Sequence, residues 1–156
     1  MTIRFEPYDP ASVALWRGGG ADDYGLAPEC AASDGGGNPC RSCLRHVEHG
    51  APMLVLAACP FVGTHPYAET GPIFLHAEDC APWSGEGAPP ILATSPDYLV
   101  KGYGADERIV YGTGGIVAAE EVVARCEALL AEERIAFVDV RSARNNCFQT
   151  RARRAG

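Results

Sequence analysis

Two short patterns place thiol and imidazole groups at spacings that suit a metal ion. The first pairs Cys40 with Cys43 across two residues, and the second pairs His76 with Cys80 across three residues. Two thiols separated by two residues in a tight turn can present both sulfurs to one tetrahedral ion, and a His and a Cys at the second spacing can face the same way on a helical turn. The spacings therefore predict a zinc site formed by Cys40, Cys43, His76 and Cys80. The gap of 32 residues between its halves is longer than in common finger modules.

The same cysteines have two other interpretations, which stay open. A C-x-x-C pair with a lowered thiolate pKa can act as a redox dithiol, although that motif normally opens a helix after a strand, and Gly and Pro precede Cys40 here. Free cysteines are also common as small residues of a core. The chain has seven cysteines, an odd number, and its first residues show no export signal, so we expect a cytoplasmic protein with reduced thiols.

A thiol-dependent enzyme is the first alternative function, and whether the chain is an enzyme at all stays open. Cys147 lies among polar residues that favour an exposed thiol, and it is the candidate nucleophile, with Cys40 as the other choice. A nucleophilic thiol needs a base, for which His76 is the candidate, and Glu69 could orient the imidazole of His76. These roles require that the fold bring the residues together.

A non-catalytic module that binds an anion or a partner is the second alternative function. Its predicted clamp consists of Arg41, Arg108 and Arg141, and the expected ligand is a small molecule or an anion. Further arginines lie near the C-terminus, at positions 144, 151, 153 and 154. The plainer interpretation of these C-terminal arginines is a solvated basic end.

Composition and charge exclude several other classes of function. The net charge of −7 argues against broad neutralisation of phosphates, so a nucleic-acid partner is not expected. No Gly-Lys-Ser/Thr follows the glycines of residues 35–37, so we expect no phosphate loop and no nucleotide cofactor. The longest apolar run covers residues 53–59 and ends at Pro60, which is too short to span a bilayer. We expect no membrane partner, and a homodimer stays open.

The elements that must position these groups are those of one α+β domain over residues 1–156. The length of 156 residues, with 47% apolar and 21% charged residues, predicts a single core built mainly on antiparallel sheet. Residues 1–39 would contain a strand, a short helix capped by Asp9 or Ser12, and a long loop from residue 22, and residues 40–156 would form the core. The 18 glycines and 12 prolines are expected in turns and long loops.

Apolar patterns predict the individual elements. The one long amphipathic helix is expected over residues 118–133, because apolar side chains recur on one stripe from Val122 to Leu130. Strands are expected where short apolar or alternating runs lie between turn residues. They cover residues 3–6, 53–59, 73–75, 98–103, 108–111, 135–141 and 147–151.

Several long and polar strings of the chain resemble those of a bacterial family catalogued as domain of unknown function 1203. The strings occupy residues 37–44, 66–76 and 140–147, together with residues 102–103 and 108–112. The resemblance covers most of the chain from about residue 20 onward. It implies a small, single-domain bacterial protein, and it brings no catalytic activity with it.

Overall fold

The computed structural model describes residues 2–156, which divide into two compact units. The first unit comprises Pro7–Ser84 and is called the cysteine unit below. The second, the C-terminal unit, comprises Gly85–Gly156 together with the first strand. Both units are built mainly on antiparallel sheet and each carries one α-helix, so the expected mixture of antiparallel sheet with helices is confirmed. The grouping of the whole chain as a single domain stays a prediction.

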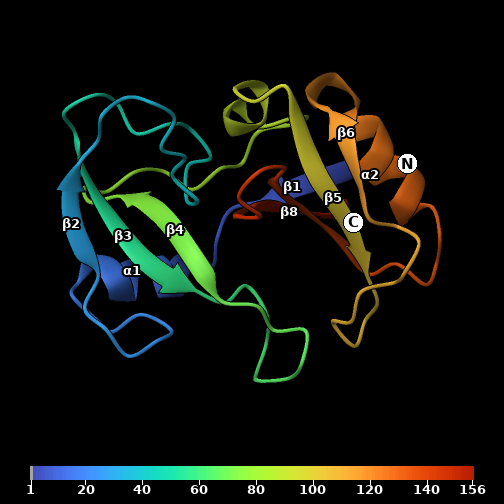
Figure 1. Cartoon of the computed structure of the whole chain (residues 1–156), viewed down its shortest axis with the longest axis horizontal. Coiled ribbons are helices and arrows are strands. Elements are labelled where there is room, and N and C mark those ends of the chain that lie inside the picture. Colours follow the sequence, from blue (N-terminus) through green and yellow to red (C-terminus); the bar gives the residue numbers. More distant parts are fainter. Residues whose placement is uncertain (1) are drawn as a thin grey trace. The chain divides into compact units, whose positions relative to one another are not determined.

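The cysteine unit contains a three-stranded antiparallel sheet in the order β2-β3-β4 (Figure 1). Its central strand β3 (Pro52–Ala58) lies between β2 (Glu29–Ala32) and β4 (Gly71–His76). β3 is the apolar run recognised in the sequence, and its buried residues are Met53, Leu54, Leu56 and Ala58. A strand with neighbours on both edges has its backbone groups paired, which suits a run with this much buried apolar surface.

β2 contradicts the expectation of one uninterrupted loop between residues 22 and 39. All four residues of β2 are exposed, so no apolar alternation marked them as a strand. The strand exists because its backbone pairs with β3, from Glu29 opposite Val55 to Ala32 opposite Pro52. An edge strand of this kind depends on its partner rather than on its own side chains.

The short helix α1 (Pro10–Arg17) confirms the predicted helix and its cap. The Asp9 carboxylate accepts hydrogen bonds from the Ser12 backbone N–H at 2.9 Å and from the Ser12 hydroxyl at 2.8 Å, which satisfies an otherwise unpaired donor at the helix start. Val13 and Trp16 are buried, and the helix ends before three consecutive glycines. Arg17 is therefore the last helical residue of α1.

The C-terminal unit contains a five-stranded antiparallel sheet in the order β1-β8-β7-β5-β6. The strands are β1 (Ile3–Glu6), β5 (Asp97–Tyr103), β6 (Gly115–Ala118), β7 (Phe137–Ser142) and β8 (Phe148–Arg154). The helix α2 (Val122–Leu130) packs against β5 and β7, and a 3-10 turn η1 (Pro90–Ala93) contributes two more buried apolar residues. The antiparallel return of β8 along β7 confirms the predicted final hairpin.

The long helix predicted over residues 118–133 is wrong. A 3-10 turn η2 (Ala119–Glu121) leads into α2, and the α-helix covers only nine residues. The predicted stripe is nevertheless the buried face of α2, where Val122, Cys126, Leu129 and Leu130 lie in the core. Beyond Leu130 the residues are exposed until Ile135, so no apolar contact extends the helix. Every helix of residues 2–156 is too short or too polar to cross a bilayer.

The strand predicted over residues 108–111 is also wrong, because β6 takes its place beside β5. Residues 108–111 form only an isolated bridge, between Ile109 and Tyr103. The loop folds instead around Thr113, whose hydroxyl donates to the Val110 carbonyl at 2.6 Å and accepts from the Gly102 N–H at 3.0 Å. These local hydrogen bonds compete with strand pairing.

A buried ion pair joins the two strands of the final hairpin. Asp139 on β7 has no exposed surface, and its carboxylate accepts hydrogen bonds from Arg151 on β8 at 2.6 and 3.0 Å. The guanidinium group of Arg151 also lies 3.7 Å from the centre of the Phe137 ring. Burial of a charge is tolerated when geometry of this kind pairs it completely.

We expect Asp139→Ala to destabilise the C-terminal unit by about 3–5 kcal/mol, because it leaves the Arg151 charge buried without its carboxylate. Urea unfolding followed by circular dichroism measures the change. The matched control is Asp97→Ala, which removes a partly exposed carboxylate that pairs with the exposed Arg144 at 2.7 Å and should cost less than about 1 kcal/mol. Equal losses in the free energy of unfolding for the two variants would show that the buried Asp139–Arg151 pair stabilises the unit no more than the Asp97–Arg144 pair does.

Candidate metal centre

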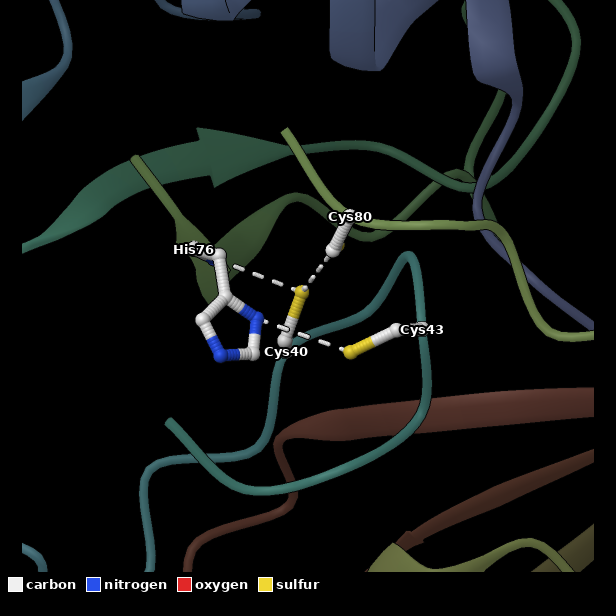
Figure 2. Close-up of side chains that lie close together, drawn as sticks. All are labelled: Cys40, Cys43, His76 and Cys80. Atoms are coloured by element: carbon white, nitrogen blue, oxygen red, sulfur yellow. Dashed lines mark hydrogen bonds between the residues drawn. The ribbon is translucent and has the colours of Figure 1, made fainter. Parts of the chain in front are cut away.

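Four side chains of the cysteine unit converge on one point. One potential ligand atom from each of Cys40, Cys43, His76 and Cys80 lies within 4.8 Å of all the others. Figure 2 shows these side chains pointing toward one another from separate stretches of the chain. The convergence joins the two halves that the sequence pattern had separated by 32 residues.

The first half is a tight turn that runs beside β4. The Leu44 N–H donates to the Cys40 carbonyl at 2.9 Å, and Leu44 adopts a positive φ of 54°, which closes the turn. Arg41, which follows Cys40, donates its backbone N–H to the Phe74 carbonyl at 3.0 Å. This contact holds the turn in register with the end of β4, so Cys40 lies beside His76. The His76 N–H then donates to the Cys40 sulfur at 3.3 Å.

The second half is a bend at the end of β4, and the helical turn expected between His76 and Cys80 is absent from it. The bend is held by Arg17 at the end of α1. The guanidinium group of Arg17 donates to the His76 carbonyl at 3.0 Å, to the Asp79 carboxylate at 3.2 Å and to the Cys80 sulfur at 3.0 Å. One side chain therefore fixes the backbone and the thiol of this half together.

Two distances within the cluster match the edges of a tetrahedron around zinc, and no two of the four ligand atoms are more than 4.8 Å apart. The sulfurs of Cys40 and Cys80 are 3.8 Å apart, and the Cys43 sulfur is 3.5 Å from Nδ1 of His76. Zn–S bonds of about 2.3 Å and Zn–N bonds of about 2.0–2.1 Å at tetrahedral angles place two sulfurs about 3.8 Å apart, and a sulfur and a nitrogen about 3.6 Å apart. The cluster is thus compatible with a metal ion held by three sulfur ligands and one nitrogen ligand.

The two thiols of the first turn have opposite pKa shifts. A hydrogen bond from the Cys43 thiol, helped by the backbone N–H groups of His76, Cys43 and Ser42, lowers the pKa of Cys40 although burial opposes the shift. The same hydrogen bond, together with burial and the charge on Cys40, raises the pKa of Cys43. The hydrogen bond therefore favours the thiolate at Cys40 and the protonated thiol at Cys43, and metal binding would displace the shared proton.

His76 is held by carboxylate and thiol partners on opposite sides of its ring. Burial acts to lower the pKa of His76, but hydrogen bonds with Cys40 and with Glu48 outweigh it, and the pKa lies above its ordinary value. Nε2 of His76 is 3.1 Å from a carboxylate oxygen of Glu48. With Nδ1 on a metal, Nε2 carries the proton and donates it to Glu48, which is the usual support for a histidine ligand.

Glu48, and not the predicted Glu69, is the carboxylate that contacts His76. Glu69 precedes the first residue of β4, whereas His76 is the last, and a strand of this length spans about 16 Å at about 3.3 Å per residue. No sequence pattern indicated Glu48, which lies 28 residues from His76. Arg17 was missed for the same reason, since it is 63 residues from Cys80.

Cys147 belongs to the C-terminal unit, at the turn between β7 and β8. Its backbone N–H donates to the Ser142 hydroxyl at 3.0 Å, and its sulfur lies 3.7 Å from the Asn145 carbonyl. These contacts give Cys147 a place in the hairpin turn. Its role as a nucleophile with His76 stays a prediction.

The three arginines of the predicted anion clamp each have local contacts. Arg41 belongs to the cysteine unit and donates to the Pro39 carbonyl at 2.6 Å. Arg141 lies opposite Leu99 near one end of β5 and donates to the Asn146 carbonyl at 3.0 Å. Arg108 lies beyond the other end of β5, in the loop before β6. Anion binding by these residues stays a prediction.

The expectation of a solvated basic end holds only in part: Arg144 and Arg154 are exposed, Arg151 is buried, and these arginines contact other parts of their unit. Arg153 contacts the Glu6 carboxylate at 3.1 Å, and Arg154 donates to the carbonyls of Leu130 and Glu132, both at 2.9 Å. The pairs of Arg144 and Arg151 with carboxylates were described above. The contacts of Arg153 and Arg154 join β8 to β1 and to the end of α2.

Comparison with known proteins identifies the family. A family model described as protein of unknown function (DUF1203) matches residues 37–154. The chain belongs to the DUF1203 family. The resemblance seen in the sequence strings is thereby confirmed, and all four residues of the cluster lie within the matched segment. Neither the curated proteins nor the solved structures contain a match to this DUF1203 protein.

We expect Glu48→Gln to weaken zinc binding by about 10- to 100-fold, because the carboxylate no longer orients and polarises His76. Competition with a chromophoric chelator measures the affinity. Glu69→Gln is the matched control and should bind zinc as the unchanged protein does. Equal weakening in both variants would contradict the assignment of Glu48 as the partner of His76.

We expect zinc to suppress the titration of His76. In the zinc-free protein the imidazole takes up a proton at a pH above its ordinary pKa of about 6.5, and that proton competes with the metal. Zinc affinity therefore falls as the pH falls through the raised pKa of His76. NMR of the ring resonances with and without zinc checks this, with exposed His49 as the internal control. A His76 titration that zinc leaves unchanged would exclude His76 as a ligand.

Proposed function

We propose that this DUF1203 protein binds one zinc ion through Cys40, Cys43, His76 and Cys80, and that the ion holds the cysteine unit together. The observation that carries the proposal is the convergence of four potential ligand atoms within 4.8 Å, with two of their distances equal to the edges of a zinc tetrahedron. Four protein ligands complete that tetrahedron. Such a closed site leaves no position for a substrate, which is typical of structural zinc.

The donor set favours zinc over the hard cations. Three thiols and an imidazole are soft or borderline ligands, whereas calcium and magnesium select oxygen ligands. Three thiolates and a neutral imidazole around Zn²⁺ carry one net negative charge, and the Arg17 guanidinium group beside Cys80 offsets it. The positive charge beside the ligands therefore balances the net negative charge of the zinc-loaded site.

A structural ion also suits the size of the cysteine unit. The unit has roughly 80 residues, with one short helix and a three-stranded sheet. Units of this size often need a disulfide or a metal in addition to their apolar core. All seven cysteines are free, so a metal is the available cross-link. The ion would join the turn at Cys40, the end of β4 and the bend at Cys80.

Metal analysis of protein purified without chelator tests the proposal, and we expect about one zinc per chain. Cys80→Ser should lower the zinc content sharply. Cys30→Ser is the matched control and should retain it, because Cys30 is an exposed residue of β2 outside the cluster. Less than about a tenth of an equivalent in folded protein would overturn the proposal.

A second measurement on the unchanged chain avoids the risk that a variant fails to fold. After removal of zinc by a chelator, we expect hydrogen exchange to speed up in residues 40–46 and 74–80, while the amides of β7 and β8 stay protected. Added zinc should restore the protection. Exchange that is unchanged after the metal has been removed would show that the ion does not stabilise the unit.

A further inference from the structure

A surface pocket of about 470 Å³ opens beside the metal cluster. Its lining includes Val13, Ala14 and Arg17 of α1, together with Ser42 and Cys80. Of the four cluster residues, only Cys80 lines this pocket. A small molecule that enters from solvent therefore reaches one sulfur of the cluster before the others.

Exposure to solvent also distinguishes Cys80 from the other two cysteines of the cluster. Cys40 is fully buried and Cys43 is 7% exposed, whereas Cys80 is only partly buried. Arg17 donates a hydrogen bond to the Cys80 sulfur at 3.0 Å, so a positive charge lies beside this sulfur. Accessible thiolates next to a second cysteine are the thiols that oxidation selects. The Cys40 sulfur, 3.8 Å behind Cys80, is that second cysteine.

We propose that Cys80 is an oxidation site for hydroperoxides, that Cys40 resolves the oxidised Cys80 into a disulfide, and that this reaction releases the zinc ion. The inference rests on the zinc site of the proposed function and concerns its regulation. It assigns different roles to two ligands that are equivalent in zinc coordination: Cys80 receives the oxidant and Cys40 forms the second bond.

The reaction balances in two steps. In the first, the Cys80 thiolate attacks one peroxide oxygen, an S–O bond forms, the O–O bond breaks, and the departing hydroxide or alkoxide takes a proton from water. In the second, the Cys40 thiolate attacks the Cys80 sulfur, an S–S bond forms, the S–O bond breaks, and hydroxide leaves and is protonated. Two thiolates lose two electrons in total, and one hydroperoxide becomes water and an alcohol, or two waters when it is hydrogen peroxide.

Loss of the metal follows from the ligand count. A disulfide between Cys40 and Cys80 removes two of four ligands, and Cys43 and His76 alone hold zinc weakly. Cys43 is the other possible partner of Cys40, with which it shares a hydrogen bond, but Cys43 lines no part of the pocket and is not the thiol that a peroxide entering there reaches. A reductant reverses the disulfide and restores the four ligands.

The experiment treats the zinc-loaded full-length chain with hydrogen peroxide after its zinc content has been measured. A chromophoric chelator follows zinc release, and peptide mapping identifies the disulfide. We expect release of the bound zinc together with a Cys40–Cys80 disulfide, and recovery of zinc binding after a dithiol reductant. Cys30→Ser and Cys147→Ser remove thiols outside the cluster and should release zinc at the unchanged rate.

The role of the pocket has its own matched pair of variants. Ala14 and Ala11 are both exposed residues of α1, but only Ala14 lines the pocket. Ala14→Phe narrows the approach to Cys80, so we expect zinc release by peroxide to slow several-fold with the initial zinc content unchanged. Ala11→Phe should release zinc as the unchanged chain does.

The outcomes separate the two proposals. A chain that holds no zinc at the start contradicts the proposed function. A chain that holds zinc but keeps it in peroxide, or loses it with only a Cys40–Cys43 disulfide, overturns the present inference and leaves the zinc site in place. Equal release rates for Ala14→Phe and Ala11→Phe would likewise overturn the assignment of the pocket as the route to Cys80.

Discussion

Three sulfur atoms and an imidazole nitrogen lie within 4.8 Å of one another in the cysteine unit, so the surrounding chain must compensate any charge that they carry. Thiolates at this distance repel each other unless protons, hydrogen-bond donors or a cation separate their charges. The structure supplies donors to each side of the cluster: backbone N–H groups to Cys40 and a guanidinium group to Cys80. The zinc ion that we propose would complete this compensation and join three stretches of chain at one point.

The two units solve the problem of burying polar groups in different ways. In the C-terminal unit the carboxylate of Asp139 and the guanidinium group of Arg151 neutralise each other between adjacent strands, and an aromatic ring lies against the cation. In the cluster of the cysteine unit three of the four potential ligand atoms are thiol sulfurs, which cannot neutralise one another. A cation is the natural partner for that arrangement, whereas the C-terminal unit already contains both charges.

Arg17 links the fold of the cysteine unit to the chemistry that we propose for it. As the last residue of α1 it fixes the bend after β4, and its third contact is the sulfur of Cys80. The same helix forms a wall of the pocket that exposes Cys80. The helix α1 therefore both supports the proposed ligand Cys80 and lines the pocket that leads to it. This helix precedes the segment that the DUF1203 family model matches.

The identity of the four proposed ligands could be predicted from the sequence, because ligand chemistry depends on residue type and the short spacings within each half restrict the local geometry. The central strand β3 and the capped helix α1 were predictable for similar reasons, since an apolar run and a capping carboxylate are local signals. Only the tertiary structure decided which distant groups meet. The backbone contact between Arg41 and Phe74 brings the two halves of the cluster together across 32 residues of sequence. Glu48 then contacts His76, and Arg17 contacts Cys80. The edge strands β2 and β6 and the short α2 also depend on pairing and packing between segments, which no local pattern of side chains records.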